Sequence, residues 1–184
     1  SVCQGRLTLT SGTAVTTADV TAAGTLYFTP YKGNSIALYD GGAKWQTFTF
    51  AEISLTLTLT NATPYDVFAY NNAGTVALET TAWTNDTTRA TALVLQNGVY
   101  VRTGATTRRY LGTIRASATN QTEDSFTKRF VWNYYNRVSR PMRVLEATDS
   151  WNYTTATMRQ ANGSTANQLA FIVGVAEVEL DAMV

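Results

Sequence analysis

Hydrophobic and polar residues alternate along much of this 184-residue chain. The clearest example is residues 53–60, where isoleucine and leucine at odd positions alternate with serine and threonine at even positions. Successive side chains of a strand point to opposite faces, so this stretch predicts a strand with one buried face. No segment of ten residues shows the 3.6-residue period of an amphipathic helix.

Turn residues separate the alternating runs at short intervals and predict three β-hairpins. Asp40-Gly41-Gly42, residues 71–74 and Asn97-Gly98 each lie between two strand-like runs, and Asn-Gly favours a type I′ hairpin turn. Further strands are predicted at 6–10, 25–28, 109–115, 151–158 and 168–177, with loops at 11–24, 84–89 and 116–125. The pattern therefore predicts an all-β fold: an antiparallel β-sandwich or jelly roll of many short hairpin-connected strands, with no substantial helix.

The length of the chain suits one β-rich unit over residues 1–184. A division into two subdomains is the alternative. Residues 1–88 would then hold the N-terminal hairpins, and residues 89–184 an aromatic and basic sandwich.

Residues 129–143 combine four aromatic side chains with four arginines. The stretch alternates at first, which predicts a strand; Pro141 breaks it, and a second strand is predicted over 142–146. Arginine and aromatic residues are enriched at protein interfaces, so we expect this stretch to contact another subunit; packing within the chain is the alternative. The predicted assembly residues are Arg129, Phe130, Trp132, Tyr134, Tyr135, Arg137 and Arg140.

The charged fraction of 15% is low, and thirty-three threonines supply polar residues in place of charged ones. A net charge of +1 gives no general attraction to nucleic acid, and no apolar run of 18 residues predicts membrane insertion. The charge is nevertheless uneven, because residues 102–143 are basic while Glu177, Glu179 and Asp181 make the end acidic. The acidic end of one copy would meet the basic region of the next, or the charges would pair within the chain.

The sequence lacks histidine and has one cysteine, Cys3. This excludes Ser-His-Asp and Cys-His catalysis and histidine–cysteine zinc sites, and no Gly-rich phosphate-binding motif is present. We therefore predict no catalytic residue, metal site or cofactor. Paired carboxylates remain the one enzymatic alternative; the candidates near predicted turns are Asp40, Asp66, Asp86, Glu123, Asp124 and Asp149.

Aromatic residues near turns suggest a second binding role. Trp151, Tyr153 and Trp45 are candidates for stacking on the sugar rings of a glycan. Aromatic side chains also dominate β-sheet cores because they bury much surface, so core packing is the alternative for each.

Several short sequence segments resemble segments of structural proteins of tailed bacteriophages: Cys3–Leu9, Thr29–Asn34, Trp83–Leu93, Arg108–Thr113, Lys128–Val138, Ala147–Tyr153 and Arg159–Asn162. The resemblance implies a non-enzymatic virion component, either a head decoration or head fibre or part of a tail fibre. It implies assembly with itself, which we expect to give a homotrimer, and with other capsid or tail proteins. A host surface glycan is a further expected partner if the chain belongs to a tail fibre. No secretory signal is visible, so we expect assembly in the host bacterial cytoplasm.

Overall fold

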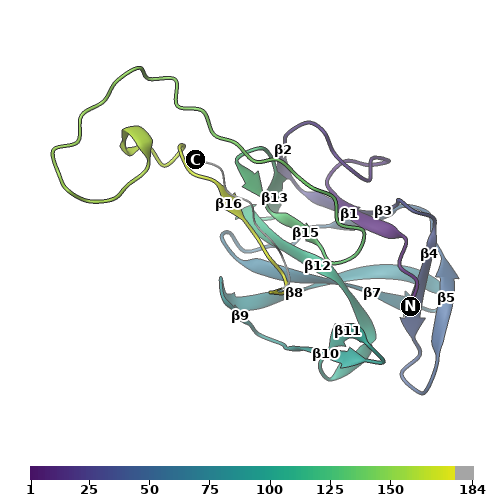
Figure 1. Cartoon of the computed structure of the whole chain (residues 1–184). Coiled ribbons are helices and arrows are strands. Elements are labelled where there is room, and N and C mark those ends of the chain that lie inside the picture. Colours follow the sequence, from purple (N-terminus) through teal and green to yellow (C-terminus); the bar gives the residue numbers. More distant parts are fainter. Residues whose placement is uncertain (177–184) are drawn as a thin grey trace.

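A computed structural model describes residues 1–176 of the chain, and Figure 1 shows that strands and loops make up nearly all of it. Within these described residues, the one helical element is a short 3₁₀ turn, Ala161–Gly163. The strands are β1 (Gly5–Thr8), β2 (Val20–Ala23), β3 (Thr25–Pro30), β4 (Ser35–Tyr39), β5 (Trp45–Thr49), β6 (Ile53–Thr56), β7 (Pro64–Asn72), β8 (Thr75–Asn85), β9 (Thr88–Arg89), β10 (Leu93–Gln96), β11 (Val99–Arg102), β12 (Ala105–Ala118), β13 (Gln121–Asp124), β14 (Lys128–Arg129), β15 (Val131–Asn133) and β16 (Ala170–Phe171).

Three sheets form the body of the molecule. A large sheet follows the order β16-β14-β13-β12-β7-β8-β9, with β10, β11, β15 and β2 attached to its sides. A three-stranded sheet has the order β1-β3-β6, and β4 pairs with β5. All pairs between these strands are antiparallel except β14 with β16. The antiparallel, sandwich-like all-β prediction is therefore confirmed.

The long strand β12 organises the large sheet. Strand β7 pairs along one of its edges, whereas β11, β15 and β13 pair with successive parts of it. Register shifts interrupt these pairings between Tyr110 and Gly112 and between Ala116 and Ala118. Such bulges increase the local twist of a strand, which accounts for the curl of the sheet in Figure 1.

Both faces of the large sheet are covered. Val67 and Leu111 point into the main core, which lies between the large sheet and the three-stranded sheet. Phe68 and Tyr110, their neighbours in the sequence, point to the other face and pack with Trp132 in a smaller cluster. The main core contains residues from before and after residue 88, so both of the subdomains considered above contribute to it.

The three predicted hairpins are present as β4-β5, β7-β8 and β10-β11. At the last one, Asn97 and Gly98 have φ angles of 52° and 79°, as a type I′ turn requires. In residues 53–60 the strand ends at Thr56, but the alternation of burial continues to Leu57 and Leu59, which are both buried.

Residues 116–125 do not form the loop that was predicted. Asn120, with a φ of 59°, makes a tight turn that leads into β13. Thr122 on β13 is fully buried and donates a 2.7 Å hydrogen bond to the Arg115 carbonyl. The prediction was wrong because polar residues of a strand were buried by partners that are distant in the sequence.

Two strands predicted in the C-terminal third are also wrong. Residues 142–146 and 151–158 form neither strands nor helices. The strand predicted at 168–177 is reduced to Ala170–Phe171, and Glu177 lies outside the described residues. Among residues 1–176, no helix is long and apolar enough to cross a bilayer.

Candidate functional site

A long loop leaves the body between Arg143 and Ala170, and we call residues 144–169 the arm (Figure 1). Both of its ends are held at one turn of the body. The Arg143 amide donates to the Phe126 carbonyl (3.0 Å), and the Ala170 amide donates to the Thr127 carbonyl (2.9 Å). A loop of this length whose one regular element is the short 3₁₀ turn Ala161–Gly163 is uncommon in compact domains, where long loops usually carry function or are disordered.

Side-chain hydrogen bonds connect the outgoing and returning limbs of the arm. The Tyr153 hydroxyl donates to the Gln160 carbonyl, and the Asn167 amide group donates to the Glu146 carboxylate. Gln160 Nε2 also bonds to Gln168 Oε1 at 2.9 Å. These contacts give the arm an internal structure of its own, and none of the three joins it to the body.

The arm also displays large apolar side chains. Of the nine large hydrophobic residues exposed in the described part of the chain, five lie on the arm and a sixth lies two residues beyond its end. Such residues are normal singly, whereas large contiguous patches of them mark interaction sites. They are Leu145, Trp151, Tyr153, Met158 and Leu169, followed by Phe171.

The base of the arm is basic. Arg129 and Arg140 both pair with the Asp124 carboxylate, at 2.8 and 3.1 Å. The guanidinium groups of Arg129 and Arg143 lie 5.3 and 5.1 Å from the centre of the Phe126 ring. Three arginines therefore surround one carboxylate and one ring, which leaves an excess of positive charge where the arm meets the body.

The predicted assembly stretch lies partly inside the chain. Phe130 and Trp132 are buried, and Tyr134 and Tyr135 are half-buried. Arg137 is exposed, with its guanidinium 5.2 Å from the Trp132 ring. These aromatic side chains thus support the fold of a single copy. Among the predicted assembly residues, Arg137 is exposed, whereas Arg129 and Arg140 are largely buried in their ion pairs with Asp124. Assembly through this stretch stays a prediction.

Arg109 is completely buried. Its guanidinium donates to the carbonyls of Val2 (2.7 Å) and Ala37 (2.6 Å) and lies 4.6 Å from the centre of the Tyr135 ring. It therefore fastens the first residues to β4 and β12. Burial also raises the pKa of the nearby Cys3 thiol to about 11, so this thiol is protonated at neutral pH.

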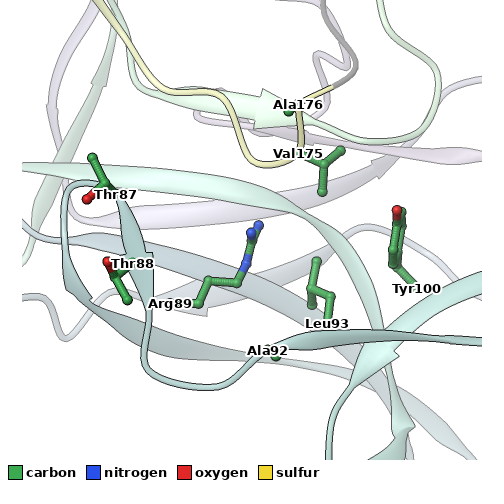
Figure 2. A pocket seen from close by; sticks show the side chains of 8 residues that line it. All are labelled: Thr87, Thr88, Arg89, Ala92, Leu93, Tyr100, Val175 and Ala176. Atoms are coloured by element: carbon green, nitrogen blue, oxygen red, sulfur yellow. The ribbon is translucent and has the colours of Figure 1, made fainter.

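A second buried polar group lies beside an open depression of about 470 Å³, shown in Figure 2. The Arg89 side chain lines this depression. Its guanidinium pairs with the buried Asp66 carboxylate at 2.7 Å and donates a hydrogen bond to the Gly174 carbonyl. Thr113 Oγ1 donates a further hydrogen bond to Asp66 (2.8 Å). The depression is lined by Thr87, Thr88, Arg89, Ala92, Leu93, Tyr100, Val175 and Ala176.

The electrostatics of this group favour a structural role. Burial raises the pKa of Asp66, against the opposing effects of Arg89 and Thr113. Burial and the Asp66 charge likewise raise the pKa of the Tyr110 hydroxyl, which shares a 2.6 Å hydrogen bond with Thr113. The arrangement fastens the segment at Gly174 to the sheet, and the carboxylate is already engaged by a cation and a hydroxyl.

Most of the other candidate carboxylates have partners of their own. Asp40 accepts three backbone hydrogen bonds in its turn, which hold the pKa of this exposed group below its usual value. Asp86 pairs with Arg115 at 3.1 Å, and Glu123 pairs with Lys128 at 3.1 Å. Asp149 lies exposed on the arm. Within the described residues, no group of three His, Cys, Asp or Glu side chains could hold a metal ion.

Charge pairing within the chain accounts for much of the basic region. Six of its nine basic side chains pair with an acid among residues 1–176, and Arg102 and Arg108 share Glu79. The acidic residues Glu177, Glu179 and Asp181 lie outside the described residues.

The structure separates the three candidate glycan-binding aromatics. Trp151 and Tyr153 are both exposed on the arm, whereas Trp45 lies on β5. Trp45 Nε1 donates to Asn97 Oδ1 (3.3 Å), and the Trp45 ring lies 5.4 Å from that of Tyr39. Trp45 therefore contributes to packing between hairpins and stands apart from the other two.

Two features were missed in the sequence. One sequence signal could have indicated that Asp66 is buried. Asp66 and Phe68 are two residues apart on the same strand, so their side chains point to the same face. The exposed pair Val94 and Leu95 on β10 had none, because an apolar run in a hairpin normally predicts burial.

The chain matches no protein-family model, and no curated protein or solved structure is significantly similar to it.

Proposed function

We propose that the chain is a non-enzymatic structural protein of a bacteriophage virion, exposed on the particle surface as a decoration or fibre component. The observation that carries this proposal is the arm. The β-sheet body carries a segment whose two limbs are joined by side-chain hydrogen bonds. This segment exposes five large apolar side chains and is therefore suited to contact another protein.

Three features support a role in assembly over one in catalysis. The candidate carboxylates Asp66, Asp86, Glu123 and Asp124 are engaged by cations. The depression beside Arg89 is open and shallow, unlike the enclosed pockets that bind small molecules. The resemblance of short segments along the chain to tailed-phage structural proteins supplies the setting, and the partners are further copies together with capsid or tail proteins.

Electron microscopy of purified phage particles labelled with a gold-conjugated antibody to this chain tests the proposal. We expect label at fixed sites on intact particles, on the head surface or on the tail. A chain that is found in the lysate but never on particles would contradict it.

A second candidate function, binding of a host surface glycan, rests on Trp151 and Tyr153. They lie two residues apart on the arm, both exposed, and Arg159 lies 4.8 Å from the Tyr153 ring. Tryptophan fluorescence titrated with host polysaccharide tests this candidate, and Trp151→Phe should remove the response. Trp45→Phe is the matched control, because Trp45 packs within the body.

A further inference from the structure

Residues 150–154 of the arm have the properties of a strand that lacks a partner. Trp151 and Tyr153 alternate with Asn152 and Thr154, and bends at residues 149 and 155 bound the segment. Aromatic and β-branched residues favour strands. None of the backbone amides or carbonyls of these five residues bonds to another backbone group within residues 1–176.

The arm keeps this segment in place while leaving its backbone available. The bond from Tyr153 to Gln160 and the bond from Asn162 to Thr148 (3.2 Å) connect it to the returning limb through side chains. Because backbone donors and acceptors are strong hydrogen-bonding groups, an exposed segment of strand-like sequence without backbone partners is a template for pairing with a sheet edge.

The body offers an edge of matching character at β10. This strand pairs with β11 and with no other strand in the described part of the chain. Val94 and Leu95 on it are 41% and 56% exposed. Natural edge strands usually carry charges or proline that prevent pairing, whereas Leu93–Gln96 has neither. Residues 150–154 are equally free of charge, glycine and proline.

The arm and β10 of one copy do not meet. Figure 1 shows the arm and the β10-β11 hairpin at opposite ends of the body. We propose that residues 150–154 of one copy pair as a β-strand with the free edge of β10 in a second copy. The pairing buries Trp151 and Tyr153, which share one face of the strand, against whichever of Val94 and Leu95 points to that face. This inference rests on the assembly role proposed above and names the contact that performs it.

The contact joins two different surfaces, the arm of one copy and the β10 edge of another, and this determines the symmetry of the assembly. Because the arm and the edge lie on different parts of the chain, the contact is heterologous. Each copy can give its arm to one neighbour and receive an arm from another, and the array closes into a ring where the rotation between copies closes and otherwise extends as a filament. The trimer expected from the sequence is one such ring.

Light scattering over a range of concentrations tests the contact. Leu95→Lys adds a charge to the edge, and Thr154→Pro removes a backbone donor from the arm. We expect each to raise the dissociation constant of the assembly by about tenfold or more. The matched controls are Thr47→Lys on the exposed edge β5 and Thr154→Ala, which keeps the amide; both should leave the assembly unchanged. All three positions are exposed in one copy, so the melting temperature of all four variants should stay constant.

Cross-linking identifies the two surfaces directly. In a Cys3→Ser background, Leu95→Cys and Thr154→Cys are prepared as separate proteins, mixed, and treated with a short bismaleimide. We expect covalent dimers in the mixture and none from either protein alone, because each contact joins one position of each kind.

The outcomes separate this inference from the proposed function. Assembly that survives both Leu95→Lys and Thr154→Pro without mixed cross-links would overturn the arm-to-edge contact, while labelled virions would leave the structural role intact. A chain that stays monomeric at every concentration yet labels virions would also overturn the contact. Unlabelled virions would instead overturn the proposed function.

Discussion

The body and the arm differ in where their polar and apolar groups find partners. In the body, buried polar groups such as Asp66 and Arg109 are hydrogen-bonded within the chain, and Val67 and Leu111 lie in one core. The arm has the same threonine-rich and aromatic character but keeps its apolar side chains in solvent. The difference shows that composition alone does not decide which strands form, because a strand also needs an edge beside it.

The largest expected effect is in the body, at Arg109. Arg109→Ala would remove the guanidinium hydrogen bonds to the Val2 and Ala37 carbonyls and would open a cavity, so we expect the free energy of unfolding to fall by about 3–5 kcal/mol. Arg143→Ala, at the exposed base of the arm, should change it by about 0.5 kcal/mol or less. Urea denaturation followed by circular dichroism measures both, and equal effects would remove the distinction between body and arm.

A smaller loss is expected at Gly174, where the chain returns from the arm to the body. A Cβ atom there would lie 2.0 Å from the Tyr110 hydroxyl and 2.5 Å from Thr113 Oγ1, so Gly174→Ala should destabilise the fold by about 1–3 kcal/mol. Gly24→Ala is the control, since its Cβ would meet the Asn120 carbonyl at an ordinary 3.7 Å. Thermal unfolding of both variants makes the comparison, and a neutral Gly174→Ala would show that this segment is not held tightly.

The pH dependence of stability tests the buried group directly. Burial raises the pKa of Asp66 above its value in the unfolded chain, so the folded state takes up this proton first as the pH falls. The stability of the wild type relative to Asp66→Asn should therefore increase between neutral pH and about pH 3 and decrease as the pH rises again. Denaturation curves measured at several pH values would contradict this if the difference had the opposite slope.

The smallest effect on stability is expected from removing the arm. Residues 147–166 can be replaced by two glycines, because Glu146 and Asn167 already contact each other where the limbs meet. Since the arm contributes little to either core and loop length has a weak effect on closure entropy, the unfolding free energy should change by less than about 1 kcal/mol. Calorimetry that showed loss of cooperative unfolding would mean that the arm belongs to the body after all.

The hairpins could be predicted because their signals are local. Asn97-Gly98 selects its own turn, and the strands beside it follow. The burial of Arg109 could not be predicted in this way, since Arg108 has the same side chain and lies half-exposed beside it. Only the register of β12 against its neighbours decides which of the two points inward.

Residues 151–158 show the opposite case, in which a local sequence signal predicts a strand that does not form. Their sequence favours a strand, and the structure of a single copy leaves them exposed and unpaired. Residues 116–125 read as a polar loop but are paired and partly buried, because β2 and β14 lie beside β13. In both places the outcome depends on which edge is available, and that information is not local.

The attachment of the arm also has a practical consequence. Its two ends bond to Phe126 and Thr127, which are neighbours in the sequence. A peptide inserted between the two ends of the arm would therefore be attached to the body at a single place. A foreign peptide inserted near residue 156 could thus be displayed to solvent without altering the sheets, which would make the chain a carrier for epitopes or fluorescent tags.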